Sequence, residues 1–286
     1  MILNPETINF DKCHVMAIIN LTPDSFYAAS RVAKMEDRQG SMRACVERID
    51  SAIKAGATIV DLGGYSSRPG AADVDIESEW MRLRRGLDAV ARIDRGVVVS
   101  LDTFRAEIVR RAYEEYGSIV VNDISAGELD EEMVATVARL GLTYVAMHMR
   151  GNPNTMSRLT DYDKGVVRGV VEYFERRTEE LHSAGIARER IILDPGFGFA
   201  KSVAQNYELM AGLESLVQLG YPVLVGVSRK SMIYKPLGVQ PEDALPGSLA
   251  LAWESLRKGA CILRVHDVAA TRQVVEVFNN YKSVML

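Results

Sequence analysis

Eight short apolar runs, rich in β-branched residues, recur along the chain, and each ends in polar, glycine or charged residues. Runs of this kind are typical of strands that are buried on both faces, as in parallel sheets. The stretches between the runs have the periodicity of amphipathic helices. Eight alternating strand and helix units predict an α/β fold, a single (β/α)8 TIM barrel. The runs cover residues 15–20, 58–64, 97–103, 119–124, 144–149, 191–196, 223–229 and 262–267.

The length of the chain agrees with one barrel. The chain has 286 residues, and a barrel of this type needs about 250. We therefore expect one domain over residues 1–286, with long polar loops after the first and second strands, at 21–37 and 65–75. In such barrels the loops that follow the strands form the active-site mouth. The polar ends of the eight runs should therefore converge there.

Composition excludes several classes of protein. The chain is 48% apolar and 25% charged, as in ordinary globular proteins. A net charge of -4 without a basic stripe argues against nucleic-acid binding. The first residues do not resemble a secretory signal, and no apolar run approaches the roughly 18 residues of a membrane span. We expect a cytoplasmic protein that binds neither membrane nor nucleic acid. Cys13, Cys45 and Cys261 are far apart, which favours packing roles over disulfides.

Cationic and hydroxyl groups follow the seventh and eighth runs. Ser-Arg-Lys-Ser occupies 228–231, Arg264 and His266 end the last run, and Arg68 lies in the second loop. Barrels often bind phosphate between the loops after strands seven and eight, where helix N-termini add backbone donors. A phosphorylated substrate is therefore predicted. The alternative is that Arg229 and Lys230 are surface charges and Ser231 a plain helix cap.

Acceptor side chains end four other runs, at Asp61, Asp102, Asn122 and Asp194. A buried carboxylate is unfavourable without donors, so we expect a ligand with several N–H groups along one edge. A planar heterocycle with an amino-pyrimidinone edge has this property. The competing interpretation is a pair of acid and base carboxylates, as in glycoside hydrolysis. The run ends contain few aromatic residues that would stack on sugars.

Protein-only metal ligation is not predicted. His148 and His266 lie on different strands, and neither HxH nor HExxH occurs. If a divalent ion takes part, Mg²⁺ held mainly by substrate phosphate and water fits best, with Asn20 as the protein ligand. Residues 196–201 begin like a GxGxxG dinucleotide motif, but Lys201 stands at the third glycine position. A Rossmann fold is therefore not predicted.

Nine motifs, in order and almost from end to end, resemble dihydropteroate synthases. The most specific are Asn-x-Thr-Pro-Asp-Ser-Phe, Ser-x-Arg-Pro-Gly, Ser-Arg-Lys-Ser and Arg-Val-His-Asp-Val. The motifs lie at 20–26, 61–71, 100–107, 122–127, 147–156, 193–202, 226–231, 247–252 and 264–268. The resemblance implies a Mg²⁺-dependent homodimeric enzyme of folate synthesis and a sulfonamide target. Such enzymes condense 6-hydroxymethyl-7,8-dihydropterin diphosphate with 4-aminobenzoate and release diphosphate.

The resemblance also implies a role for individual residues. The pterin group is Asp102, Asn122, Ile124, Met147, Asp194, Phe199, Lys230 and Arg264. The diphosphate group is Asn20, Arg68, Arg264 and His266, with Asn20 also the Mg²⁺ ligand. The aminobenzoate group is Asp24, Ser67, Arg68, Pro69 and Ser231. The catalytic residues implied are Asp102, Lys230, Arg264, Asp24 and Arg68.

Two loops depart from the family pattern. Tyr65 stands where the family usually has Glu, Ser67 replaces Thr, and Ala28-Ala29 lie in a segment that is commonly Ser-x-Asp-Gly-Gly. These changes keep open a silent pterin-binding paralogue. A second alternative is a pterin-binding methyltransferase of the same barrel superfamily. That enzyme would have no use for Ser-Arg-Lys-Ser or for a diphosphate clamp.

Overall fold

A computed structural model describes residues 2–22, 38–65 and 74–284. Within these residues, parallel strands alternate with helices along the chain. The strands are β1 Ile2–Leu3, β2 His14–Asn20, β3 Ile59–Gly63, β4 Val97–Asp102, β5 Val120–Asp123, β6 Thr143–Met147, β7 Ile191–Asp194, β8 Leu224–Val225 and β9 Ile262–Val265. The helices are α2 Arg38–Lys54, α3 Ile76–Ala91, α4 Ala106–Tyr116, α5 Met133–Leu140, α6 Val166–Ser183, α7 Val203–Ala211, α8 Leu213–Val217, α9 Ser231–Leu237, α10 Leu245–Arg257 and α11 Val268–Ser283. Short 3₁₀ turns are η1 Pro5–Thr7, η2 Met156–Arg158, η3 Arg188–Arg190 and η4 Pro241–Asp243.

The strands form one parallel sheet in the order β7-β6-β5-β4-β3-β2-β9-β8. A single bridge between Leu193 and Val223 joins β7 to β8 and closes the ring. The predicted (β/α)8 barrel is therefore confirmed. β8 is shorter than the predicted run 223–229, because the chain turns away after Val225 and Arg229 adopts a positive φ of 55°.

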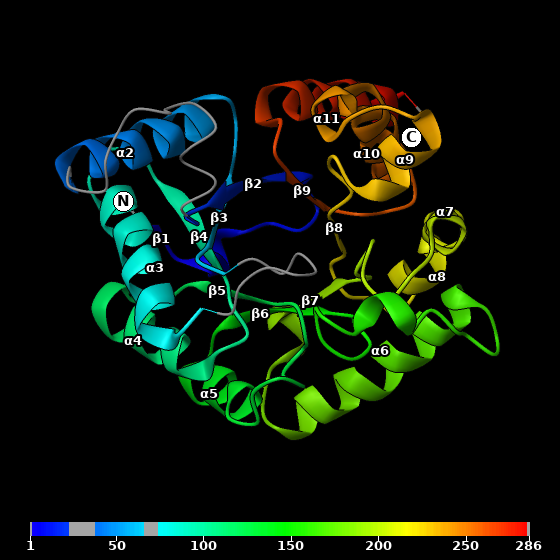
Figure 1. Cartoon of the computed structure of the whole chain (residues 1–286), viewed down its shortest axis with the longest axis horizontal. Coiled ribbons are helices and arrows are strands. Elements are labelled where there is room, and N and C mark those ends of the chain that lie inside the picture. The colour runs from blue at the N-terminus through cyan, green and yellow to red at the C-terminus, as the bar shows by residue number, and fades with distance from the viewer. Residues whose placement is uncertain (1, 23–37, 66–73, 285–286) are drawn as a thin grey trace.

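The helices surround the strands (Figure 1). A helix follows each strand from β2 to β9, and its apolar stripe packs on the outer face of the sheet. In α4, for example, Ile108, Val109 and Ala112 are fully buried, whereas Glu107 faces outward and pairs with Arg111. No helix within the described residues is both long and apolar enough to cross a membrane.

A layer of apolar side chains forms the floor of the barrel. Each of the eight strands from β2 to β9 contributes one buried residue to it. The residues are Met16, Ile59, Val98, Val120, Val145, Ile192, Leu224 and Ile262. Leu3, Ile8 and Phe10 pack against this layer, and β1 pairs with β4. The sequence did not predict β1, because two residues are too short for a periodic pattern.

The floor determines which residues face the mouth. Since side chains alternate across a strand, positions two and four residues after the floor point to the same interior. Two residues after Ile59, Val120, Ile192 and Ile262 come Asp61, Asn122, Asp194 and Arg264. Four residues after Met16 and Val98 come Asn20 and Asp102. The apolar floor thus carries a polar layer above it.

Candidate active site

Arg264 lies at the centre of the polar layer, between two carboxylates. Its Nε donates to Asp61 Oδ2 and its Nη2 donates to Asp102 Oδ2, each at 2.6 Å. Asn122 Nδ2 donates to the same Asp61 oxygen at 3.1 Å. Residues from β3, β4, β5 and β9 are therefore joined across the barrel by one hydrogen-bond network. The guanidinium plane is fixed before any ligand arrives.

Burial and neighbouring charges shift the protonation of this network. Burial raises the pKa of Asp102 to about 7; Arg264 opposes the rise and Asp61 adds to it. Burial alone would lower the pKa of Arg264, but Asp61 and Asp102 raise it above its usual value. Arg264 therefore stays charged, while Asp102 titrates near neutrality. Asp61 is fully buried, and its Oδ1 has no hydrogen-bond partner among the described residues.

Asp194 and Lys230 lie on the other side of the mouth. Asp194 is 6% exposed, and its Oδ1 accepts from the Gly196 N–H at 2.8 Å. Burial raises the pKa of Asp194, and Lys230 opposes the rise. Burial lowers the pKa of Lys230 to about 8, and Asp194 opposes that decrease. Gly226 lies between the two cations: a Cβ there would be 3.7 Å from Arg264 Cβ and 3.9 Å from Lys230 Nζ.

Apolar residues of the predicted pterin group form a separate cluster above the floor. Ile124 and Met147 are buried in it, and Phe199 packs against it. The Lys230 ammonium lies 5.0 Å from the centre of the Phe199 ring. The sequence missed other members of the cluster, because a methionine or phenylalanine in a loop gives no sign of which surface it covers. They are Met149, Met156, Ala200 and Phe104.

The predicted diphosphate residues that the structure describes lie at the ends of neighbouring strands; they are Asn20, Arg264 and His266. A Cβ on Gly63 would be 3.7 Å from both Asn20 Oδ1 and Asp102 Oδ2, so these two oxygens flank the end of β3. His266 follows β9 and is exposed, and its Nδ1 is 3.1 Å from Ser228 Oγ. Asn20 and His266 thus border the mouth from adjacent strands, since β2 pairs with β9.

The sequence position of Arg229 suggests that it binds an anion, but its side chain is engaged elsewhere in the protein. Its guanidinium makes two hydrogen bonds of 2.8 Å to the Asp267 carboxylate and donates to the carbonyls of Pro241 and Glu242. The positive φ of Arg229 turns this side chain away from its neighbours in the motif. Arg229 therefore fastens the loop after β8 to the start of α11. Ser231 is the first residue of α9.

Several predicted residues lie outside the described residues. They are Asp24, Ser67, Arg68 and Pro69. Tyr65 is described, and its ring meets Phe104 edge-on at 5.3 Å between centroids. The Arg105 guanidinium lies 5.6 Å from the centre of the Tyr65 ring. The residue that replaces the family's usual Glu therefore packs against an aromatic neighbour of the apolar cluster.

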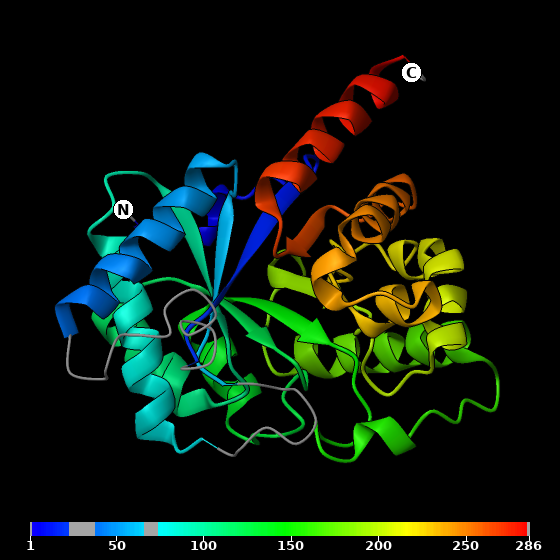
Figure 2. The ribbon, with the colours of Figure 1, turned by 45° about the horizontal axis from the view of Figure 1, so that its top comes forward.

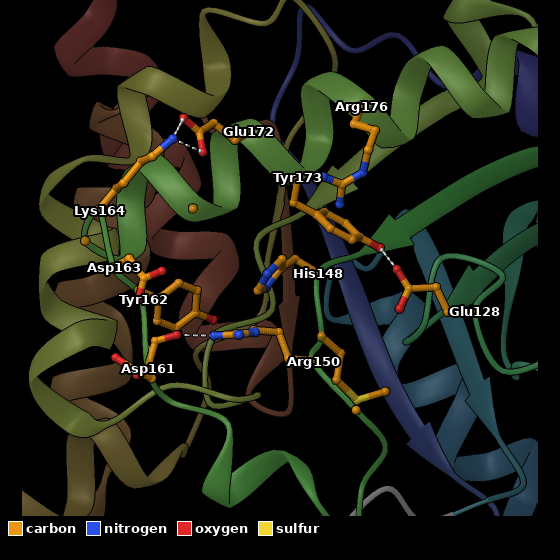
Figure 3. Close-up of a pocket in the computed structure, with 14 residues that line it drawn as sticks. Glu128, His148, Arg150, Asp161, Tyr162, Asp163, Lys164, Glu172, Tyr173 and Arg176 are labelled. Carbon is orange, nitrogen blue, oxygen red and sulfur yellow. Dashed lines mark hydrogen bonds and ion pairs between the residues drawn. The ribbon is translucent and has the colours of Figure 1, made fainter.

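The sequence also missed a buried pair behind the site. Lys201 Nζ lies 3.0 Å from His148 Nδ1, and both side chains are almost fully buried. His148 borders a cavity of about 540 Å³ outside the barrel mouth, where it lies between Tyr162 and Tyr173 (Figure 3). None of the predicted pterin residues that the structure describes lines this cavity. The sequence marks Lys201 only as the residue that stands at the third glycine position of the motif 196–201. That position does not indicate a role for the lysine.

Comparisons with known proteins agree with this geometry. Residues 16–266 match a family model described as "Pterin binding enzyme". The chain is 41% identical to the dihydropteroate synthase of Escherichia coli K12 over 92% of this chain and 90% of that protein. It is 38% identical to the Haemophilus influenzae dihydropteroate synthase over 96% of each.

Solved structures give the same result. A Yersinia pestis dihydropteroate synthase in complex with a sulfonamide drug superposes with a TM-score of 0.86 and 33% identity, covering 97% of this chain and 96% of that chain. A Xanthomonas albilineans dihydropteroate synthase with 4-aminobenzoic acid superposes with a TM-score of 0.85 and 36% identity. The match covers 96% of this chain and 95% of that chain.

The barrel and its polar mouth, together with the family model, define a pterin-binding enzyme. Within that class the chain belongs to the dihydropteroate synthase family, the transferases that act in folate biosynthesis. The predicted fold, activity and family are therefore confirmed. Membership of this family also favours the synthase over the methyltransferase alternative.

Proposed function

We propose that the polar layer at the mouth binds the pterin of a pterin diphosphate. The Asp102 and Asp194 carboxylates accept from N–H groups of the pterin edge, Asn122 lies beside them in the same layer, and Lys230 donates to the oxo and ring-nitrogen side of the pterin. The observation that carries this proposal is the Arg264 guanidinium, which Asp61 and Asp102 hold in place across the barrel. A planar cation fixed in this way offers a flat surface for a planar ring.

The apolar cluster provides the walls of the proposed slot. The cluster buries Ile124 and Met147, and Phe199 packs against it. The Phe199 ring lies beside the Lys230 ammonium. Apolar walls with a few convergent polar groups are the usual form of a small-molecule site. The walls exclude water from the ring, and the polar groups determine its orientation.

Catalysis requires an anion clamp more than a strong base. The bond between the pterin methylene and diphosphate breaks with both electrons going to the leaving oxygen, so positive charge develops on the methylene. The aryl amine of 4-aminobenzoate then forms the new C–N bond through its nitrogen lone pair and loses one N–H proton to the surroundings. Arg68, Arg264 and His266 stabilise the departing diphosphate, and the Asp102 carboxylate stabilises the electron-poor ring. Exclusion of water protects the cation from hydrolysis.

The second substrate is assigned to the loops and to α9. Asp24, Ser67, Arg68 and Pro69 belong to this group together with Ser231, which directly follows Lys230 at the start of α9. The Xanthomonas albilineans structure, which contains 4-aminobenzoic acid, supports binding of that compound by this family.

Mg²⁺ fits the proposed site as a partner of the substrate phosphates. The described residues contain no cluster of three or more His, Cys, Asp or Glu that would hold a metal alone. Asn20 Oδ1 lies at the mouth, and an amide oxygen is a ligand that Mg²⁺ accepts. When bound, the ion would neutralise charge on the leaving diphosphate. We further propose that residues 1–286 work as one domain, in a cytoplasmic homodimer.

Lys230→Ala tests the pterin assignment. We expect weaker pterin-diphosphate binding by calorimetry and less diphosphate release when both substrates and Mg²⁺ are supplied, because a charged donor is lost from the slot. Lys258→Ala is the matched control, since Lys258 pairs with Glu214 and Glu254 on the outer helices. Unchanged pterin affinity in Lys230→Ala would refute the assignment. Pterin binding by the wild type without diphosphate release would favour the silent paralogue.

Arg68→Ala should impair turnover and aminobenzoate binding with pterin affinity retained.

A further inference from the structure

Lys201 is a buried cation that the reaction above does not use. It is 8% exposed, and its Nζ lies 3.0 Å from His148 Nδ1, 3.0 Å from Gly196 O and 2.9 Å from Phe199 O. An ammonium has three N–H donors, so each has an acceptor. No carboxylate in the described part of the chain forms an ion pair with it. Since burying an ammonium without a carboxylate is unfavourable, this arrangement needs a reason.

The segment that Lys201 holds has an unusual backbone. Gly196, Gly198 and Ala200 have φ values of 67°, 81° and 50°. A Cβ on Gly196 would lie 2.0 Å from the carbonyl oxygen of His148, so only glycine fits against the end of β6. A left-handed conformation at Ala200 is unfavourable for a residue with a Cβ and persists only where surrounding contacts fix it. Two of these contacts are the hydrogen bonds that Lys201 donates to the carbonyls of Gly196 and Phe199.

The opposite side of the same segment contacts Lys230. Lys230 Nζ donates to Phe197 O at 2.5 Å and lies 5.0 Å from the centre of the Phe199 ring. Lys201 therefore binds the carbonyls of residues 196 and 199, and Lys230 binds the carbonyl between them. If the segment rotated, the carbonyl and the ring that orient the Lys230 ammonium would both move.

We propose that Lys201 is a positioning residue: it holds residues 196–200 in the shape that aims the Lys230 ammonium into the pterin slot. The inference rests on the proposed function, in which Lys230 binds the pterin. Lys201 does not touch the substrate and acts through the backbone that Lys230 contacts.

Lys201 carries its charge below about pH 7. Burial lowers the pKa of Lys201 to about 7; Asp194 from β7 opposes the decrease, whereas Lys230 and Arg150 add to it. Burial lowers the pKa of His148 well below its usual value, so the imidazole is neutral and accepts at Nδ1. Above about pH 7 a neutral Lys201 keeps two N–H donors, enough for the two carbonyls that it binds.

Tyr162 adds a second tether to the segment. Its hydroxyl donates to Ala200 O at 3.1 Å, and its ring lies beside His148 in the cavity wall (Figure 3). The segment is therefore held at three carbonyls from the side away from the pterin slot. Tyr162→Phe removes one of these bonds and leaves the buried ammonium in place.

A double-mutant cycle with Lys230 tests the inference. The dissociation constant of 6-hydroxymethyl-7,8-dihydropterin diphosphate is measured by calorimetry at pH 6 for wild type, Lys201→Met, Lys230→Met and the double variant. We expect Lys201→Met to weaken binding about tenfold in the wild-type background, the effect of losing one well-placed charged contact. In the Lys230→Met background the same change should cost less than about twofold, because the residue through which Lys201 acts is gone.

Each result is decisive. Wild-type affinity in Lys201→Met overturns the inference, and so does an equal loss in both backgrounds, which would show an effect independent of Lys230. Normal affinity in Lys230→Met would refute the proposed site itself, and the inference with it. Lys258→Met is the matched control: its side chain is 10% exposed and ion-paired, and its loss should leave pterin affinity unchanged.

A second variant keeps the test valid if Lys201→Met does not fold. Tyr162→Phe should fold and weaken pterin binding about threefold, with no further loss in the Lys230→Met background. Wild-type affinity in Tyr162→Phe would then overturn the inference.

Discussion

Arg264 and Lys230 show how two cations of one site can differ in what they do for the fold. Arg264 neutralises a fully buried carboxylate at Asp61 and a second one at Asp102. Lys230 contacts a backbone carbonyl and an aromatic ring. Removing Arg264 breaks two ion pairs, whereas removing Lys230 breaks no ion pair among the described residues and takes away a cation near the buried Asp194.

Arg264→Met should therefore lower the free energy of unfolding by about 3 kcal/mol, the usual effect of breaking a buried ion pair. Lys230→Met should lower it by only about 1 kcal/mol, because one hydrogen bond to a carbonyl is lost, no ion pair is broken among the described residues, and the buried Asp194 can take up a proton. Urea unfolding of the two variants measures the difference. Equal stabilities would mean that Arg264 contributes to binding alone.

The pH dependence of kcat/KM for the pterin substrate should be a narrow bell. Asp102, with a pKa of about 7, gains its charge as pH rises, and Lys230, with a pKa of about 8, loses its charge above that. Only between these values are both groups in the form that binds the pterin, and kcat/KM reports the free enzyme. Asp102→Asn should retain low activity without the acid limb. An unchanged acid limb in that variant would assign it to another group.

At the scale of elements, α3 fixes the end of β4, where Asp102 lies. Glu79 of α3 is fully buried; it accepts from Thr103 Oγ1 at 2.7 Å and from Arg105 Nη1 at 2.7 Å. Arg82 of the same helix donates to Gly64 O at 2.9 Å, just after β3. One helix thus braces two strand ends that carry site residues.

Glu79→Ala should destabilise the protein by about 3 kcal/mol, because the Arg105 guanidinium loses its buried carboxylate. Glu107→Ala, which removes a half-exposed carboxylate from α4, should cost less than about 1 kcal/mol. Thermal and urea unfolding compare the two. A small effect at Glu79 would show that water replaces the carboxylate.

The elements also show how far the sequence could be interpreted. Buried strands require apolar residues, so the eight runs marked the strands, and alternation placed Asp61, Asn122, Asp194 and Arg264 on one side. An apolar run does not show how many of its residues pair with a neighbouring strand. The sequence therefore did not predict that β8 is only two residues long. The partner of Arg229 lies 38 residues away, and local sequence does not encode that contact. The burial of Lys201 depends on His148, another distant partner.

At the scale of the whole molecule, the ring of strands has one weak seam. β7 and β8 share a single bridge, whereas β3 and β4 pair over five positions. Asp194 ends β7 and Lys230 follows β8, so the proposed pterin site spans this seam. Closure of the barrel there depends on few backbone hydrogen bonds.

Hydrogen exchange should reveal the seam. Backbone amides of residues 223–227 should exchange faster than those of 97–102, since regions with fewer hydrogen bonds open more readily. A bound pterin should slow exchange at 223–227 more than at 97–102, because it links both sides of the seam. Mass spectrometry of peptides with and without ligand measures this. Equal protection in both regions would contradict the seam.

The floor of the barrel has a practical consequence for anyone preparing this enzyme. Ile2 and Leu3 extend the sheet along β4, and Ile8 and Phe10 close the interior from below. The far end of α11 points away from the strands (Figure 2). An affinity tag is therefore better fused after α11. A peptide fused before Ile2 would crowd the apolar residues that cover the floor of the barrel.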